Sequence, residues 1–397
     1  MKDENVCPVF ESMPKEQCSG CEVCLNTCPV SALSLEADSA GFLYPALHPE
    51  KCIRCNKCLR VCPMLNTTPL INDQEVYFGA SHTNDEVLLQ SASGGIFTFL
   101  VDEFKKIYPE GNVVGAIYSE DFKQVKHFLS KEYENVLKMK SSKYFQSCKQ
   151  DIYAQVREKL ENDEAVFFSG APCEVTALYY YLGKQEYKKL WTMDFICKGS
   201  SSPQILRDFV EYWETKYNSK AMYINMRYKW PAVDNWIPQF LMIKFENGRK
   251  LFKEFYNTEL GIGFQILQRG SCHNCPFREN KHYSDFTIGD LHDADKNSEI
   301  YNHLGVSAVI INTEKGRLLW ESFHKKILRL KVLDKETIYS KNRNPIDPRG
   351  EILKKKLINN NSVKAVRKSI GLKTKIKMIM PVMLLRKATI WRREHKK

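Results

Sequence analysis

The pattern of hydrophobic positions predicts strands that alternate with helices over most of the chain. The segments EVYFGASH at residues 75–82 and GNVVGAIY at residues 111–118 are short and rich in β-forming residues. Between them, residues 96–107 have the spacing of a helix with one apolar face. That predicted face consists of Ile96, Phe97, Leu100, Val101, Phe104 and Ile107.

The same alternation continues towards the C-terminus. Residues 164–182 and 189–213 each predict a strand, a tight loop and a helix, and residues 305–323 predict another strand and helix. Residues 236–255 predict a β-hairpin with the turn ENGR, and residues 284–293 predict a short strand that ends in an acidic loop. Because strands alternate with helices, we expect most of the chain to form an α/β core.

The N-terminal region carries a different pattern, a run of four cysteines that occurs twice. The runs are CSGCEVCLNTCP at residues 18–29 and CIRCNKCLRVCP at residues 52–63. Both have the C-x-x-C-x-x-C-x-x-x-C-P spacing of bacterial-type ferredoxins, in which the fourth cysteine of each run binds the other cluster. Zinc sites usually use two separated pairs of ligands, and disulfides have no use for this periodic spacing.

The spacing therefore predicts two [4Fe–4S] clusters in a dicluster domain at residues 1–66. The predicted ligands are Cys18, Cys21, Cys24 and Cys62 for the first cluster, and Cys28, Cys52, Cys55 and Cys58 for the second. Cys7 lies outside the runs and is interpreted as a spare thiol. Two clusters relay electrons but perform no organic chemistry alone, so the rest of the chain should hold what gives or receives the electrons. A polar linker is expected at residues 66–75.

The charge of the chain is concentrated at its C-terminal end. The formal net charge is +12, and residues 351–397 contain 15 Lys and Arg against two Glu, so the first 350 residues are close to neutral. A near-neutral body argues against binding of nucleic acid. The N-terminus lacks the apolar segment of a signal peptide, and no apolar run approaches the roughly 18 residues of a membrane span, so we expect a cytoplasmic location.

Residues 346–397 are expected to form a basic tail. Its apolar middle, Met378–Leu385, is interrupted by Pro381 and flanked by basic residues and Trp391. This pattern suits a helix lying on an anionic membrane, which would be a peripheral contact at the inner membrane face. A flexible extension and a helix docked on the body are the alternatives.

Four further cysteines are candidates for a third site. Cys173 and Cys197 follow predicted strands, and Cys272 and Cys275 have C-x-x-C spacing. They form either one more metal-binding set or buried free thiols, and Cys173 is alternatively a low-pKa nucleophile at a helix start. Cys148 follows no pattern and is interpreted as a packed thiol.

The loop SASGGIF also suggests chemistry. It places Ser93, Gly94 and Gly95 between a strand and a helix, where backbone N–H groups can approach a phosphate. A tight turn capped by Ser93 is the alternative. Asp290, in IGDLHD, is either catalytic or a turn cap, and we favour the structural role.

Several of these segments together resemble a known family. They are SASGG, MKSSKYFQS, SGAPCEVTAL, DFICKGSSSP, SCHNCPFR and SDFTIGD, in this order between about Tyr77 and about Trp320. The set resembles the beta subunit family of the 8-hydroxy-5-deazaflavin-reducing hydrogenase and of formate dehydrogenase. Fused to a dicluster domain, the chain is similar to the bacterial branch of that family. The resemblance divides the body into an N-terminal part at residues 76–158 and a C-terminal part at residues 159–345.

The resemblance implies an α+β ferredoxin-like dicluster domain followed by an α/β flavin-binding domain with FAD. The implied flavin residues are Ser93, Gly94, Gly95, Lys143, Gly170 and Pro172. Lys143 would pair with the FAD pyrophosphate or stabilise reduced flavin, and its alternative is a solvated surface lysine. The resemblance also implies that Cys173, Cys197, Cys272 and Cys275 bind a third [4Fe–4S] cluster.

These parts together predict an iron–sulfur flavoprotein oxidoreductase. Electrons would come from a ferredoxin or another low-potential donor and pass through the clusters to FAD and then to an organic acceptor. No residue identifies a deazaflavin site. Bacterial relatives suggest a role in surface polysaccharide synthesis. The alternative hypothesis is a non-catalytic electron-transfer subunit that serves a separate redox partner.

Overall fold

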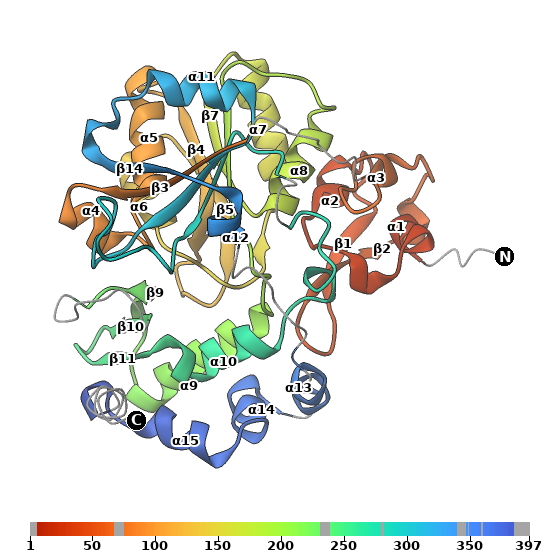
Figure 1. Ribbon diagram of the computed structural model, residues 1–397. Helices are drawn as coiled ribbons and strands as arrows, with labels where there is room; N and C mark the ends of the chain where they lie inside the picture. The colour runs from red at the N-terminus through yellow and green to blue at the C-terminus, as the bar shows by residue number, and fades with distance from the viewer. Residues whose placement is uncertain are drawn as a thin grey trace.

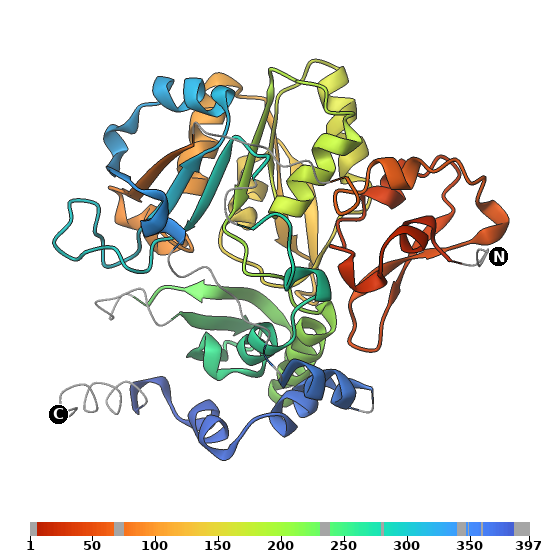
Figure 2. The same ribbon diagram turned by 45° about the vertical axis from the view of Figure 1, so that its right-hand side comes forward.

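The protein is described by a computed structural model that covers residues 6–66, 75–230, 239–278, 282–339, 347, 349–358 and 360–384. A small N-terminal unit lies beside a large mixed sheet, and a second, smaller sheet lies below it with the C-terminal helices (Figure 1). Turning the molecule by 45° keeps the N-terminal unit at one side and the C-terminal helices along the lower edge (Figure 2). The smaller sheet is formed by a segment that lies between β8 (Leu190–Phe195) and β12 (Phe286–Asp290), two neighbouring strands of the large sheet.

The N-terminal unit repeats its backbone as well as its sequence. In the first cysteine run, Gly20 and Glu22 are left-handed, with φ of 72° and 63°, and in the second run Arg54 and Asn56 have φ of 52° and 57°. These residues separate successive cysteines at equivalent positions, so each run turns twice in the same way. The unit contains α1 (Pro8–Ser12), α2 (Val23–Thr27), α3 (Lys57–Arg60) and the antiparallel hairpin β1 (Leu33–Ala37) and β2 (Leu43–Leu47).

The large sheet has nine strands in the order β14-β3-β13-β12-β8-β7-β4-β5-β6. Within it β12, β8, β7 and β4 are parallel, so their carboxyl ends meet at one edge. In α/β proteins such an edge is the usual place for a ligand. The strands are β3 (Val76–His82), β4 (Asn112–Tyr118), β5 (Val125–Ser130), β6 (Ser147–Cys148), β7 (Val166–Ser169), β8 (Leu190–Phe195), β12 (Phe286–Asp290), β13 (Ser307–Ile311) and β14 (Leu328–Leu333).

Helices cover both faces of this sheet. On β7, Phe167 packs into a core with α5 (Ile96–Ile107) and α11 (Glu314–Ser322), whereas Phe168 packs into a core with α7 (Ile152–Glu161) and α8 (Pro172–Tyr181). Successive strand residues point to opposite faces, so a continuous apolar run is buried on both sides. The remaining helices around the sheet are α4 (Asp85–Gln90), α6 (Tyr133–Met139) and α12 (Lys335–Tyr339).

The predicted strands and helices of this core are confirmed, with one error in the buried face of α5. Ile107 was assigned to that face, but it is the last helical residue and is 51% exposed. The apolar spacing continues to the last residue of the helix, whereas its buried residues end at Phe104. The apolar pattern alone therefore overestimates the packed length of the helix.

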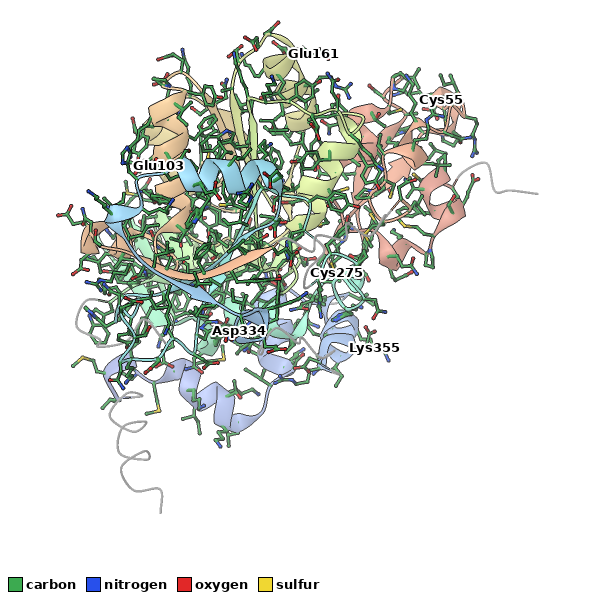
Figure 3. The ribbon with its side chains drawn as sticks, turned by 45° about the horizontal axis from the view of Figure 1, so that its top comes forward. Cys55, Glu103, Glu161, Cys275, Asp334 and Lys355 are labelled. Carbon is green, nitrogen blue, oxygen red and sulfur yellow. The ribbon has the colours of Figure 1, made fainter. Side chains whose placement is uncertain are left out.

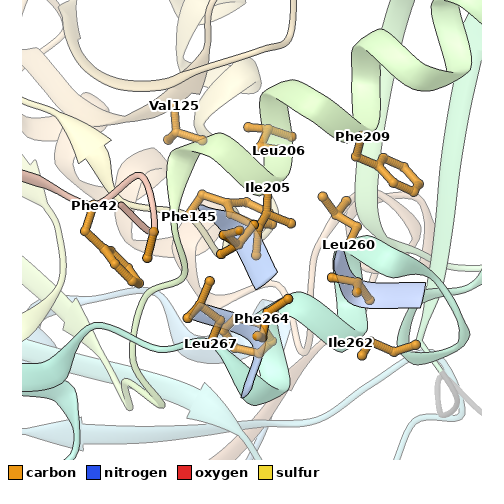
Figure 4. Packing of buried hydrophobic residues seen from close by; sticks show 14 of the residues in the cluster. Phe42, Val125, Phe145, Ile205, Leu206, Phe209, Leu260, Ile262, Phe264 and Leu267 are labelled. Carbon is orange, nitrogen blue, oxygen red and sulfur yellow. The ribbon is translucent and has the colours of Figure 1, made fainter. Parts of the chain in front are cut away.

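The smaller sheet has the order β11-β10-β9 and contains the predicted hairpin. Its strands are β9 (Ala221–Tyr228), β10 (Phe240–Phe245) and β11 (Lys250–Glu254), and its helices are α9 (Pro203–Tyr217), α10 (Glu259–Ile266), α13 (Arg349–Leu357), α14 (Ser362–Lys368) and α15 (Leu372–Ile379). A single core joins it to the N-terminal unit, since Phe42 lies in the same cluster as Ile205 and Leu267 (Figure 4).

The described part of the C-terminal tail is helical and docks on this sheet and its helices. The backbone N–H of Ser362 donates to the Asp208 carboxylate at 2.7 Å, and Arg367 forms an ion pair with Glu259 at 2.6 Å. These residues are therefore docked on the body, and the alternative of a flexible extension is wrong for them. Residues 385–397, which include Trp391, lie outside the described residues. Across the described part of the chain, no helix is both long enough and apolar enough to cross a bilayer.

Candidate iron–sulfur and flavin site

The eight cysteines of the two runs surround two separate hollows in the N-terminal unit. Cys18, Cys21, Cys24 and Cys62 line the first, and Cys28, Cys52, Cys55 and Cys58 line the second. The last cysteine of each run thus lies with the first three of the other run, which is the exchange that the ferredoxin spacing predicts. We call these the inner and the outer cluster hollow.

The donor set of each hollow fits a [4Fe–4S] cluster. Four thiols surround each hollow, and a cubane takes one thiolate on each of its four irons. Among the described residues, no three His, Cys, Asp or Glu side chains converge as they do around a single metal ion. In the outer hollow the Cys28 Sγ also accepts a hydrogen bond from the Ala32 N–H at 3.3 Å. Such N–H···S bonds stabilise a thiolate and tune the potential of a cluster.

The two hollows differ in their exposure to solvent. The inner cysteines are buried, with exposed fractions between 6% and 9%, whereas all four outer cysteines are partly exposed. Cys55 lies at the far end of the N-terminal unit, and Cys275 lies on the side of the body (Figure 3). The outer hollow is therefore the one within reach of a partner in solution.

The four remaining candidate cysteines gather at the carboxyl edge of the large sheet. Cys173 lies in the first turn of α8 after β7, and Cys197 follows the neighbouring parallel strand β8. The pKa of the Cys173 thiol is raised by burial and also by the thiols of Cys275 and Cys197, and Cys272 raises the pKa of Cys197. These mutual effects place the four thiols within electrostatic range of one another.

Burial changes the interpretation of Cys173. It raises the pKa of this thiol well above its ordinary value, which is opposite to the shift that an activated nucleophile needs. The nucleophile alternative is therefore disfavoured. A thiolate at Cys173 would need a metal to stabilise it. At the neighbouring Cys197, the Sγ accepts a hydrogen bond from the Gly199 N–H at 3.3 Å, which favours a thiolate there.

The inner hollow lies next to this third group of thiols. Cys21 contributes to the raised pKa of Cys173, so the two thiols are close although they belong to different domains. The Tyr153 hydroxyl on α7 donates to the Cys21 carbonyl at 2.9 Å. Lys149 contacts both the N-terminal unit and the body. Its backbone N–H donates to Glu22 of the N-terminal unit at 2.8 Å, and its Nζ pairs with Glu174 of α8 at 2.5 Å. The three thiol groups therefore form a series from the surface to the sheet edge.

Arg269 is a second link across the same interface. Its side chain is fully buried, its Nε donates to the Cys18 carbonyl at 2.6 Å, and its Nη1 donates to Gln146 at 2.9 Å. Its guanidinium lies 4.1 Å from the ring centre of Tyr44. Burial raises the pKa of Cys272, and Arg269 partly opposes this shift. Sequence reasoning missed Arg269, Lys149 and Glu22, because no local pattern marks them.

The loop Ser93–Gly95 has a structural role. The Ser93 hydroxyl donates to the Val306 carbonyl at 2.7 Å, and the Gly94 N–H donates to the Ser307 hydroxyl at 2.8 Å. A Cβ on Gly94 would lie 2.4 Å from the Ala80 carbonyl oxygen. Gly95, with φ of 83°, is the N-cap of α5. Ser93 and Gly94 thus bond to the neighbouring strands, and the serine is not the side-chain cap of the helix that the alternative supposed.

Lys143 is not a solvated surface lysine. Its Nζ donates to the backbone carbonyls of Met139, Lys140 and Ser141 at 3.0 to 3.4 Å and lies 5.5 Å from the ring centre of Tyr118. Burial lowers the pKa of Lys143 to about 7. No carboxylate among the described residues pairs with it, and the Tyr118 hydroxyl beside it is buried without a described partner. This pair could therefore accept an anionic group.

Gly170 and Pro172 shape the start of α8. The Gly170 N–H donates to the Met193 carbonyl at 3.2 Å, and Pro172 occupies the first helical position, where its missing N–H costs nothing. The Ala171 N–H donates to Glu174 at 2.7 Å. Glu174 also lies 3.5 Å from His127, whose pKa is lowered to about 4, mainly by burial and in smaller part by Lys149 and Lys143. The first turn of α8 is thus linked to β5 through Glu174 and His127.

A polar cluster from the smaller sheet closes the same edge. Arg227 on β9 pairs with Asp290 at 2.7 Å and donates to the Ala92 carbonyl at 2.7 Å, and Lys229 donates to the Leu88 and Ser93 carbonyls. Asp290 is therefore held by an ion pair with Arg227, and its role stays a prediction. Arg227 and Lys229 were not identified from the sequence, although two cations alternating in a strand were a usable signal.

An N-terminal thiol unit that adjoins a thiol-bearing sheet edge is the architecture of an iron–sulfur electron-transfer protein. Comparison with known families agrees: residues 17–65 match the 4Fe-4S dicluster domain, and residues 163–336 match the C terminus of the coenzyme F420 hydrogenase/dehydrogenase beta subunit. A dicluster match near the N-terminus is therefore followed by a match to the C-terminal domain of that beta subunit. The resemblance noted in the sequence is confirmed.

The comparison with solved structures matches a chain of the F420-reducing [NiFe] hydrogenase complex from Methanosarcina barkeri, studied by xenon derivatization. The two chains are 16% identical, with a TM-score of 0.46, and the match covers 76% of this chain and 94% of that chain. No curated protein matches the chain.

Proposed function

We propose that the protein is an iron–sulfur flavoprotein oxidoreductase. Single electrons arrive from a ferredoxin or another low-potential protein at the outer cluster, pass through the inner and third clusters, and reach FAD at the sheet edge. The observation that supports this best is the series of three thiol groups, which starts at the partly exposed outer hollow, continues through the buried inner hollow and ends at the group that contains Cys173. Fourteen free cysteines also support a reducing, cytoplasmic location.

The surface around the outer hollow supports an acidic donor protein. Lys51, Arg54, Lys57 and Arg60 are exposed there, and Arg54 and Lys57 line the hollow itself. Arg54 is paired with Glu11 at 2.6 Å, which leaves the other three to attract a partner. Complementary charge raises the rate of encounter and weakens with salt.

The proposed flavin position is the region of Lys143 and Tyr118. A partly buried ammonium without a described carboxylate partner would be stabilised by an anionic part of the cofactor, either the pyrophosphate or the reduced ring. Ser93, Gly94 and Gly170 bond to protein groups, so we propose that they shape the wall of the pocket. Bound flavin would accept single electrons and deliver them in pairs.

The acceptor is proposed to be an organic molecule that receives a hydride and a proton. No described residue selects its structure. A sugar or sugar-linked acceptor from surface polysaccharide synthesis belongs in the first screen, together with a deazaflavin. If no acceptor is reduced while electrons still pass to a partner protein, the chain is the electron-transfer subunit of the alternative hypothesis.

Anaerobic purification followed by assays of iron, sulfide and released flavin tests the proposal. Three clusters and one FAD predict about twelve irons and one flavin per chain, since each cubane holds four irons. About eight irons without flavin would contradict both the third cluster and the FAD assignment.

The donor surface has its own test. Lys57→Glu should lower the second-order rate of reduction by an acidic ferredoxin at low salt and reduce its dependence on ionic strength. Lys326→Glu, at an exposed position near β14, is the control. Equal rates for both variants would show that donors arrive elsewhere.

A further inference from the structure

The last described segment of the chain has an apolar face that points away from the body. Leu372, Ile376 and Ile379 of α15 are spaced by four and three residues, and their exposed fractions are 74%, 50% and 79%. Helical residues at this spacing share one side. Large aliphatic side chains gathered in this way mark a contact surface.

The opposite side of the segment is attached to the smaller sheet. Met378 packs on the core that contains α10, and Val382 is buried beside Phe240. The Lys253 Nζ donates to the carbonyls of Ile379 and Met380 at 3.4 and 3.3 Å. The exposed apolar face is therefore held in a fixed orientation, along the edge where α13, α14 and α15 lie (Figures 1 and 2).

Positive charge surrounds this face. Lys373, Lys375 and Lys377 lie on α15 itself, and Lys364 and Lys368 are exposed on α14. Among the described residues from 349 to 384, Glu351 is the single acidic side chain. Lysines beside exposed aliphatic side chains are the composition of a helix that lies in the interface of an anionic bilayer.

We propose that this C-terminal face, defined by Leu372, Ile376 and Ile379 with the lysines of α15, binds the surface of an anionic lipid membrane. The aliphatic side chains enter the headgroup region, and the lysines pair with lipid phosphates. Nucleic acid is a poorer fit, because the face presents aliphatic side chains where base stacking would need aromatic ones. The body would then stand on the bilayer with the N-terminal unit at its side, as in Figure 1.

Vesicle co-sedimentation of the full-length, anaerobically purified protein tests the proposal. Binding is expected to vesicles with about 30% phosphatidylglycerol and to be at least about tenfold weaker to pure phosphatidylcholine. Replacing Lys373, Lys375 and Lys377 by Gln should weaken binding by about a hundredfold, at about 1 kcal/mol for each lysine. Replacing Leu372, Ile376 and Ile379 by Gln should weaken it at least about tenfold.

Matched controls distinguish binding through this surface from nonspecific adsorption to vesicles. Leu318→Gln changes an exposed leucine that is 56% accessible on α11, far from α15, and should leave vesicle binding unchanged. Iron content confirms that each variant is folded. Binding that survives the triple Gln replacement of Leu372, Ile376 and Ile379 would overturn the proposal, as would a dimer in light scattering that the same replacement dissociates.

Discussion

Arg269 and Cys18 are 251 positions apart in the sequence, and the Arg269 Nε donates a 2.6 Å hydrogen bond to the Cys18 carbonyl oxygen. The guanidinium is fully buried, its Nη2 has no described partner, and no carboxylate among the described residues forms an ion pair with it. A buried cation without a counter-ion is costly. The anionic clusters proposed on either side would supply the missing negative charge, since Arg269 lies between Cys18 and Cys272.

Arg269→Met should therefore lower the midpoint potential of a neighbouring cluster. Removing a nearby positive charge disfavours the added electron, by an amount on the order of 50 mV. The same change breaks buried hydrogen bonds to Cys18 and Gln146, which costs about 1–3 kcal/mol in stability. A redox titration followed by EPR measures the potential. Arg269→Lys keeps the charge, so its midpoint potential should lie close to that of the native protein. If both variants have the native midpoint potential, Arg269 has only a structural role at the interface between the domains.

Cys275→Ser should remove the third cluster alone. The iron content is expected to fall by about four atoms per chain, while the EPR signals of the two clusters in the N-terminal unit remain. Cys148→Ser is the matched control, because Cys148 is also a partly buried thiol but lies 3.8 Å from the Glu22 carboxylate and outside the third group. Loss of iron in the Cys148 variant, or none in the Cys275 variant, would contradict the assignment.

Lys143 should make the stability of flavin-free protein depend on pH above neutrality. Burial lowers its folded pKa to about 7, below the value near 10.4 of an unfolded lysine. Between these values the unfolded chain holds a proton that the folded chain lacks, so this contribution to the free energy of unfolding increases as pH rises. Thermal melts between about pH 7 and 9 should show a smaller slope for Lys143→Met than for the native protein. Lys138→Met, at an exposed lysine of α6, the helix that precedes Lys143, should keep the native slope.

Gly94→Ala should destabilise the protein strongly. The new methyl group would lie 2.4 Å from the Ala80 carbonyl oxygen and 2.6 Å from the Ser307 backbone nitrogen, and backbone atoms of two strands cannot easily move away. Overpacking of this kind costs about 1–3 kcal/mol or more, which should appear as a lower melting temperature. Gly371→Ala is the control, because nothing lies within 4 Å of its added Cβ. An unchanged melting temperature for Gly94→Ala would show that the loop can shift to accommodate the added methyl group.

The site illustrates which residues a sequence can and cannot identify. The eight cysteines of the two runs were predictable, because their spacing reflects chemistry carried by a few consecutive residues. Cys173, Cys197, Cys272 and Cys275 were visible as candidates, but only the neighbouring ends of β7 and β8 show that they meet. Lys149 and Arg269 carry no local signal, since each joins its segment to the N-terminal unit through a partner more than 100 residues away.

The sequence by itself determined the doubled cluster motif, the order of strands and helices, the hairpin at β10 and β11, and the basic C-terminal region. These features depend on local spacing, periodicity and turn chemistry, which a short window of residues contains. The tertiary structure alone decided that Ser93 and Gly94 bond to neighbouring strands, that Lys143 is partly buried without a described carboxylate partner, and that Leu372, Ile376 and Ile379 face outward. The physical reason is that burial and pairing depend on which distant segments pack together, and no single segment contains that information.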